Sequence, residues 1–278
     1  MMTTNEVYEI HDLNDPRLLP YRNLSVREPA VEGPLFIAEG GLLVRRLLDS
    51  PLAVHSVVLA RFQAQRYAPL ARGRAPVYIV PDELSHEVVG FRFHSGVIAA
   101  GWRPTTAGVG AELQIAQANS SRTVLLACPR LSNYQNLGAI IRSGAALGAS
   151  GLLLGPECCD PWARQSVRVS MGSVFTLPVV RCEALEPELR GLRERGFELH
   201  ASVLDPAATS LEELRLPRDR PVVLLLGPED QGLDPDLTRL CDRRITLAMA
   251  RGTDSLNVAA AAAVFLYHYL KIAPQPEG

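Results

Sequence analysis

The second half of the chain is a succession of short, almost wholly apolar runs separated by segments with helical patterns. The runs are TVLLAC (123–128), GLLLG (151–155), VFTLPVV (174–180), FELHASVL (197–204), PVVLLLG (221–227) and RRITLAM (243–249). Continuous apolar strands are typical of parallel sheets, because helices cover both faces of such sheets. The segments between the runs are long enough for helical crossovers. We therefore predict a parallel α/β sheet.

Helical patterns fill the gaps at residues 136–149, 161–173 and 185–195, and a last helix, LNVAAAAAVFLYHYLKI, follows Ser255. Ser255 is expected to cap this last helix, because its hydroxyl can accept a hydrogen bond from a free N–H group of the first turn. The helix is apolar but shorter than a bilayer span. We predict that it is buried in the protein and that the chain has no membrane partner.

The front part is predicted to be a second, smaller α/β domain. Apolar runs at residues 35–38, 54–60, 77–80 and 96–101 alternate with helical patterns at 39–50 and 82–90, after an arm over residues 1–30 with one short helix. A chain of 278 residues is expected to hold two domains. We place them at residues 1–105 and 122–278, joined by a linker at 106–121 that is rich in small and polar residues.

Charge and cysteine content exclude several classes of protein. Lys and Arg total 28 against 30 Asp and Glu, so bulk charge cannot hold a nucleic acid and any RNA contact needs a local patch. The five cysteines form no C-x-x-C pair and the six histidines lack metal-ligand spacing, so no metal is expected. The cysteine pattern and an N-terminus unlike a signal peptide predict a cytoplasmic protein.

Three segments carry polar residues that an α/β core does not need. In NLGAIIR (136–142), Asn136 starts a helix and Arg142 lies six residues further on. In LGPEDQGL (226–233), two glycines flank an acidic tip that contains Glu229, and the third segment, 247–258, holds Ser255 and Asn257. Open α/β sheets bind ligands at the carboxyl ends of their strands, so we expect the three loops to meet there. Helix capping, a solvated helix face and ordinary loop geometry are the alternative interpretation.

Taken in order, the three segments resemble a known family. N-x-G-x-x-x-R (136–142), G-x-E-x-x-G-L (227–233) and M-x-x-x-x-x-S-L-N-V-x-x-A (249–261) resemble the motifs of the SpoU (TrmH-like) RNA 2′-O-ribose methyltransferases of the SPOUT superfamily. The segment SVRVSMGSVFTLPVV (166–180) is also similar to that family, and the resemblance covers roughly residues 122–273. One departure is Ala248, where the family usually has a proline.

The resemblance implies a C-terminal part threaded into a deep trefoil knot, a homodimer formed through this domain, and S-adenosylmethionine (AdoMet) bound in a bent shape. By position, the cofactor contacts fall on Gly227, Leu247, Met249 and Leu256. Main-chain groups can read an adenine edge, and a glycine permits their close approach.

The reaction that the resemblance implies is in-line displacement of the sulfonium methyl group by a ribose 2′-oxygen. Arg142 would act on the 2′-hydroxyl, either as the base or as an electrostatic clamp on phosphate and oxyanion, since a guanidinium rarely loses a proton. The residues that would position Arg142, the ribose and the cofactor are Asn136, Glu229, Ser255 and Asn257.

The front domain resembles the L30e-like substrate-binding domains fused to such methyltransferases, on the segment LFIAEGGLLVRRLL (35–48) and the order of its elements. This domain contains a patch of four arginines, with Tyr67 available for stacking: Arg61, Arg66, Arg72 and Arg74. We predict that the patch binds RNA; the alternative is a solvated helix face.

The sequence thus predicts an AdoMet-dependent RNA 2′-O-methyltransferase acting on structured RNA. We expect ribosomal RNA, because a fused front domain suggests recognition of a folded site, and transfer RNA is the alternative. A non-catalytic RNA-binding protein with the same fold is the competing hypothesis, favoured by the acidic balance and by Ala248. A dinucleotide-binding enzyme is disfavoured, because no G-x-G-x-x-G opens a helix after a strand.

Overall fold

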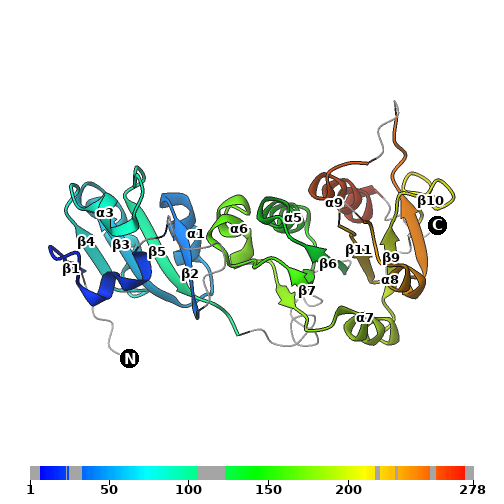
Figure 1. Cartoon of the computed structure of the whole chain (residues 1–278), viewed down its shortest axis with the longest axis horizontal. Coiled ribbons are helices and arrows are strands. Elements are labelled where there is room, and N and C mark those ends of the chain that lie inside the picture. The colour runs from blue at the N-terminus through cyan, green and yellow to red at the C-terminus, as the bar shows by residue number, and fades with distance from the viewer. Residues whose placement is uncertain are drawn as a thin grey trace. The chain divides into compact units, whose positions relative to one another are not determined.

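The computed structural model describes residues 7–22, 24, 33–105, 123–216, 220–228, 231–250 and 255–272. The predicted linker at 106–121 lies outside these residues. The chain divides into two compact units (Figure 1), which are described separately. The N-terminal unit consists of Met1–Thr105 and Asp160–Thr176, and the C-terminal unit of Thr106–Cys159 and Leu177–Gly278.

The N-terminal unit is built on a mixed five-stranded sheet of order β1-β4-β3-β5-β2. Strands β1, β4 and β3 are parallel, whereas β5 runs antiparallel to both β3 and β2. The strands are β1 (Val7–Glu9), β2 (Leu35–Glu39), β3 (Val54–Ala60), β4 (Val77–Val80) and β5 (Val97–Trp102). The four predicted strands are present. The edge strand β1 was not predicted, because a three-residue exposed strand has no apolar run to reveal it.

Short helices cover the faces of this sheet. They are η1 (Pro16–Tyr21), α1 (Gly41–Asp49), η2 (Arg61–Gln63), α2 (Ala64–Tyr67), η3 (Ala68–Ala71) and α3 (Ser85–Val89), with α6 (Arg164–Val169) and η4 (Ser173–Phe175) from the later segment. Tyr21 is fully buried and its hydroxyl donates to the carbonyl oxygen of Ser56 at 2.8 Å. Burial raises the pKa of this phenol.

The C-terminal unit is an all-parallel sheet of seven strands, in the order β10-β12-β9-β11-β6-β7-β8. This confirms the predicted fold class. The strands are β6 (Val124–Leu131), β7 (Gly151–Cys158), β8 (Val179–Arg181), β9 (Glu198–Ser202), β10 (Thr209–Ser210), β11 (Val222–Leu225) and β12 (Arg243–Thr246).

Helices lie on both faces of this sheet (Figure 1). They are α5 (Tyr134–Leu147), α7 (Leu185–Glu194), α8 (Pro235–Leu240), α9 (Val258–Tyr267) and the π-helical η5 (His268–Ile272). Leu125 on β6 belongs to the core beneath α7 and α8, whereas the next residue, Leu126, faces α5. Adjacent strand residues therefore support opposite layers, which explains why the strands are apolar throughout. Helices α5 and α9 pack against each other.

Two predicted elements had wrong boundaries, and one helix was missed. The run 174–180 is not one strand: residues 173–175 form η4, and β8 begins only at Val179, after a proline. The helix expected over 161–173 is confined to α6 and η4. Helix α8 was missed because it is short; Asp234 caps it by accepting a hydrogen bond from the N–H of Asp236 at 2.7 Å.

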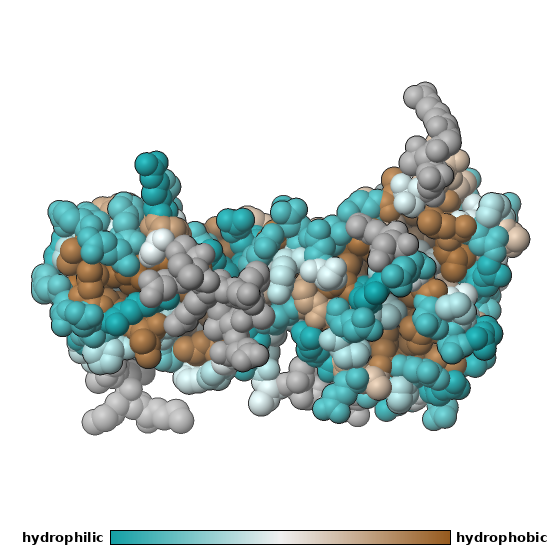
Figure 2. Space-filling view, in the orientation of Figure 1, coloured by the Kyte–Doolittle hydropathy of each residue, from teal (hydrophilic) through white to brown (hydrophobic). Residues whose placement is uncertain are grey.

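On the visible face of each unit, polar residues dominate and smaller apolar areas are scattered among them (Figure 2). Among the residues that the structure describes, none of the helices combines the length and apolar character that a membrane span requires. Threading of the C-terminal part into a knot stays a prediction, since strand order records only which strands are neighbours.

Candidate active site

A pocket of about 490 Å³ lies at the carboxyl edge of the C-terminal sheet. Its walls come from the segments at the ends of three neighbouring strands: 202–205 after β9, 226–228 and 231–233 after β11, and Leu247 and Met249 after β12. The start of α9 closes it, with Ser255 and Leu256. This is the edge at which open α/β sheets place their ligands.

Four residues predicted to contact a cofactor line this one pocket: Gly227, Leu247, Met249 and Leu256. Ser255, predicted to position the substrate, lines it as well. The wall formed by residues 202–205 was missed, although its place directly after an apolar strand was a usable signal. Leu204 is 66% exposed within this wall and offers an apolar surface to a ligand.

The loop after β11 folds back on itself, and this explains its two glycines. A Cβ atom at Gly227 would lie 2.6 Å from the backbone of both Gly232 and Leu233. The N–H of Gly232 donates to the carbonyl oxygen of Pro228 at 3.0 Å, with Gly232 at a φ of +67°. The loop is therefore closed by backbone contacts that a larger residue at position 227 would break. Glu229, predicted to act at this site, lies outside the described residues.

The third loop ends differently from the prediction. Asn257, and not Ser255, caps the last helix: its side chain accepts hydrogen bonds from the N–H groups of Ala259 at 3.0 Å and Ala260 at 3.4 Å. The helix begins at Val258. Ser255 precedes the cap by two residues and is exposed at the pocket wall, so its hydroxyl is available to a ligand.

Asn136 connects the first predicted segment to the third. Asn133 caps α5 by accepting from the N–H groups of Gln135 and Asn136, so capping does not account for the side chain of Asn136. Asn136 is only 9% exposed, and its Oδ1 accepts a hydrogen bond of 3.1 Å from Nδ2 of Asn257. A buried amide needs such partners, and this bond ties together the first turns of α5 and α9.

Arg142 is placed apart from these residues. It is exposed on α5, and its guanidinium forms no hydrogen bond or ion pair with the residues that the structure describes. Six helical residues separate it from Asn136, which amounts to about 9 Å along the axis and about 120° around it. Arg142 does not line the pocket.

The predicted RNA-binding arginines of the N-terminal unit have different roles. Arg61 forms a two-bond ion pair with Glu9, at 2.9 Å for each bond, which lowers the pKa of that carboxyl. Arg74 donates to the backbone carbonyls of Ser50 and Leu52. Arg66 lies over the ring of Tyr67, 5.3 Å from its centroid. Arg72 is exposed, and its guanidinium makes no hydrogen bond or ion pair within the described part of the chain.

No metal centre emerges from the described part of the chain, where no three His, Cys, Asp or Glu side chains are grouped to hold an ion. Desolvation raises the pKa of the buried Cys158 to about 11, that of the buried Cys182 to about 11 and that of the half-buried Cys241 to about 12, so none of the three is activated as a thiolate.

The site is a pocket at the carboxyl edge of a parallel sheet, walled by glycine-containing loops and a capped helix start, which is where open α/β proteins bind nucleotides and cofactors. The model of the SpoU rRNA methylase family matches residues 123–267, which include the whole of this site. The chain belongs to the SpoU family of RNA methyltransferases.

Relatives match over both units. A tRNA/rRNA methyltransferase of Mycobacterium tuberculosis is 35% identical over 94% of this chain and 91% of its own length. The 23S rRNA (guanosine(2553)-2′-O)-methyltransferase RlmP of Bacillus subtilis is 26% identical over 94% of this chain and 98% of its own length. The structure of an AdoMet-bound rRNA methyltransferase from Sinorhizobium meliloti superposes with a TM-score of 0.77 and 27% identity, covering 94% of this chain and 97% of that one.

Proposed function

We propose that the protein transfers a methyl group from AdoMet to a ribose 2′-hydroxyl of a structured RNA, with ribosomal RNA as the preferred substrate. The observation that carries the proposal is the single pocket in which Gly227, Leu247, Met249, Ser255 and Leu256 meet, although they come from separate loops. Two relatives support this chemistry: the Bacillus subtilis protein is a ribose 2′-O-methyltransferase, and the Sinorhizobium meliloti protein is an rRNA methyltransferase with AdoMet bound.

The pocket residues fit AdoMet. Its volume of about 490 Å³ lies within the usual range for small-ligand sites, about 300–1,000 Å³. Exposed Leu204 and Leu256 offer apolar contact to an adenine ring, and the bare Cα of Gly227 lets the peptide groups of its loop approach the ligand. When bound, AdoMet supplies an electrophilic methyl group on its sulfonium sulfur.

The chain's own groups would position the ribose and lower the cost of developing charge. Ser255 at the pocket wall can hydrogen-bond to a ribose hydroxyl, and the Asn136–Asn257 bond holds the helix starts around it. A guanidinium keeps its proton near neutral pH. Arg142 would therefore stabilise the charge on the 2′-oxygen and on a neighbouring phosphate; action as the base is the alternative. Positioning of this kind contributes up to about 7–11 kcal/mol to a displacement reaction.

A second copy of the chain would complete the site. Val264 and Tyr267, three residues apart on α9, are 44% and 53% exposed, and Ile272 is 57% exposed. Exposed apolar residues on one helix face are typical of a protein–protein interface. Helix α5, which carries Arg142, packs beside this helix. We propose that two copies associate through α5 and α9 and that Arg142 serves the pocket of the opposite copy.

The chemical test uses purified protein, AdoMet with a labelled methyl group, and ribosomal or transfer RNA. Label is expected on ribose, where it protects the neighbouring phosphodiester from alkaline hydrolysis. Label on a base, or on neither RNA, would contradict the proposal. The position of Arg142 outside the pocket lining favours the competing hypothesis of a non-catalytic RNA-binding protein. Calorimetry with AdoMet distinguishes the two, because failure to bind AdoMet would support the non-catalytic protein.

The shared site is tested by mixing two inactive variants, Arg142→Ala and Asn257→Ala. If Arg142 acts across the interface, the mixed dimer regains about a quarter to a half of native activity, because one of its two pockets has both groups. Continued inactivity of dimers shown to exchange subunits would place Arg142 in the pocket of its own chain.

A further inference from the structure

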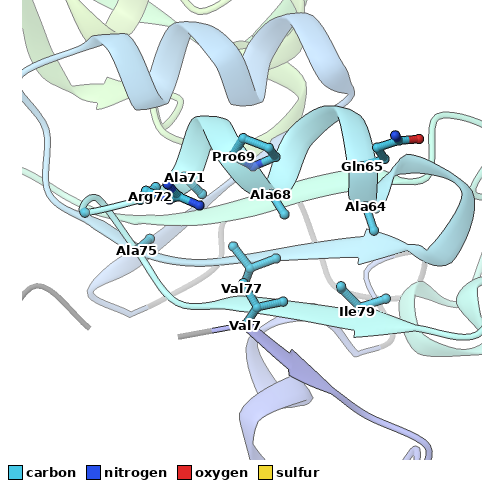
Figure 3. Close-up of a pocket in the computed structure, with 11 residues that line it drawn as sticks. Val7, Ala64, Gln65, Ala68, Pro69, Ala71, Arg72, Ala75, Val77 and Ile79 are labelled. Atoms are coloured by element: carbon cyan, nitrogen blue, oxygen red, sulfur yellow. The ribbon is translucent and has the colours of Figure 1, made fainter. Parts of the chain in front are cut away.

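A second pocket, in the N-terminal unit, has no part in the reaction described above. It is a groove of about 580 Å³ between the α2–η3 segment and strands β4 and β1, and we name it the α2–β4 groove (Figure 3). Val77 and Ile79 point from the sheet toward the helical segment, and Ala64 and Ala68 point back toward the strands. Because the helical residues that face the strands are small, the two layers leave a groove between them.

The groove lies in a basic part of the chain. Residues 61–81 contain four arginines and neither aspartate nor glutamate. Glu9, on β1, is already paired with Arg61. Arg72 lines the groove at one end, is exposed, and forms no ion pair within the described residues. The charge at this end of the groove is therefore uncompensated and available to an anion.

The combination of an apolar slot with a cation at its end selects among ligands. A phosphate alone would satisfy Arg72 but leave the slot empty, and an apolar peptide would fill the slot but leave the arginine unused. An unpaired nucleotide satisfies both, since its base has apolar faces and its phosphate is an anion. The lining is aliphatic, so the base would lie against alkyl groups and not stack on an aromatic ring.

We propose that the α2–β4 groove binds an unpaired nucleobase of the substrate RNA, with the adjoining phosphate on Arg72. This rests on the proposed function only in taking RNA as the substrate. Arg66 follows the lining residue Gln65, and its stacking over Tyr67 holds its guanidinium near the same helical segment, where it can meet the next phosphate. Arg61 is paired with Glu9 and Arg74 donates to backbone carbonyls, so this proposal assigns no phosphate to either of them.

The test measures binding of two labelled probes to the full chain without AdoMet, by fluorescence anisotropy: a short single-stranded oligoadenylate, and an abasic ribose-phosphate oligomer of the same length. Ala68→Phe fills the slot, and Arg72→Gln removes the cation. Matched controls are Ala184→Phe and Arg195→Gln, which make the same changes at exposed positions at the two ends of α7. Thermal unfolding verifies that each variant folds, and Ala64→Leu replaces Ala68→Phe should the latter not fold.

Ala68→Phe is expected to weaken oligoadenylate binding about tenfold, as loss of one base contact does, without affecting the abasic probe. Arg72→Gln should weaken both probes and reduce the slope of log affinity against log salt by about 0.7, the value for one phosphate on a single strand. The controls should match the native protein. Equal binding of the two probes by the native chain, or no effect of Ala68→Phe, would overturn the proposal.

The outcome is independent of the methyl-transfer reaction, because no AdoMet is present. Ultraviolet cross-linking of the oligoadenylate adds a direct location: the adduct should map to the tryptic peptide 75–92, which contains Val77 and Ile79. An adduct elsewhere in the chain would also contradict the groove. If Ala68→Phe binds the probes as the native protein does and still transfers methyl groups, the groove proposal is wrong and the proposed function stands.

Discussion

At the scale of single residues, Gly227 is a position where the structure leaves no room for a side chain. The backbone of residues 232–233 occupies the space that a Cβ atom would need. We therefore expect Gly227→Ala to displace the loop and weaken AdoMet binding on the order of tenfold or more, which corresponds to about 1.4 kcal/mol or more. Isothermal titration calorimetry with AdoMet measures this directly.

The control is Gly191→Ala on α7, where a Cβ atom meets nothing within 4 Å. The same substitution there should leave AdoMet binding unchanged and stabilise the helix by about 0.5–1 kcal/mol, because alanine is the better helix former. Equal AdoMet affinities for the two variants would show that close packing of the loop is not what fixes the pocket.

The hydrogen bond between Asn257 and Asn136 gives a second residue-scale prediction. Asn257→Ala removes both a helix cap and this bond, and should cost about 1–2 kcal/mol of the free energy of unfolding. Asn257→Asp keeps the cap but not the Nδ2 donor, so it should retain most of the stability and still lose activity. Urea unfolding and methyl-transfer rates separate the two effects. Full activity in Asn257→Asp would mean that the bond has no role in the reaction.

Residue types and spacing were enough to predict which loops meet at one pocket, but not that Arg142 lies outside its lining or how the residues that meet are used. Gly227, Leu247 and Leu256 were placed correctly at one pocket, because loops that follow parallel strands must end at the same edge. The capping role was assigned to Ser255 instead of Asn257, because two polar residues near a helix start are equivalent until the backbone shows where the helix begins. The exposed position of Arg142 depends on helix orientation, which sequence does not carry.

At the scale of secondary structure elements, the parallel sheet was predictable because apolar runs leave few alternatives. Short elements were not: α8 has six residues and β8 three, and both depend on neighbours distant in the chain. The buried polar cluster at the start of β9 is also a product of the assembled sheet. Glu198, His200 on the same strand and Arg243 on β12 are brought together only when the strands pair.

This cluster predicts how the sheet responds to acid. The contact with His200, with a separation of 3.3 Å between Nε2 and Oε1, and the bond from Arg243 lower the pKa of Glu198 to about 2 from its ordinary value of 4.5. Because the folded-state pKa is the lower one, the stabilisation is fully present above about pH 4.5 and is lost as the pH falls toward 2. We expect Glu198→Gln to be less stable by about 1–2 kcal/mol at neutral pH, roughly half of the full linkage value, because the arginine partners are partly exposed.

Urea unfolding of both proteins as a function of pH measures this. The difference between them should shrink steadily below pH 4.5, as Glu198 takes up a proton in the native protein. Arg190→Gln, which breaks an exposed ion pair with Glu186 on α7, serves as the control and should change stability by less than about 1 kcal/mol. A difference that does not vary with pH would show that Glu198 contributes by packing and not by charge.

At the scale of the whole molecule, the N-terminal unit contains a segment of later sequence. Residues 160–176 pack on β2: the rings of Trp162 and Phe175 lie 4.8 Å and 5.5 Å from that of Phe36, and Asp160 pairs with Arg103 at 2.7 Å. The sequence predicted a boundary at residue 105 from composition alone. Composition changes mark linkers, but they carry no information on a segment that packs on a distant strand.

The fragment of residues 1–105 should therefore be less stable than the same sheet in the whole chain. Phe36 is 1% exposed in the full structure, and removal of Trp162 and Phe175 would return part of its ring to water, at a cost of about 2–3 kcal/mol. We expect the fragment to show faster hydrogen exchange at β2 and to bind a dye specific for exposed apolar surface. A peptide of residues 158–178, added in excess, should restore protection, whereas the same peptide with Trp162→Ala and Phe175→Ala should not. If the fragment alone, with no peptide added, protects β2 from exchange as well as the full chain does, the sheet of residues 1–105 is stable without residues 160–176.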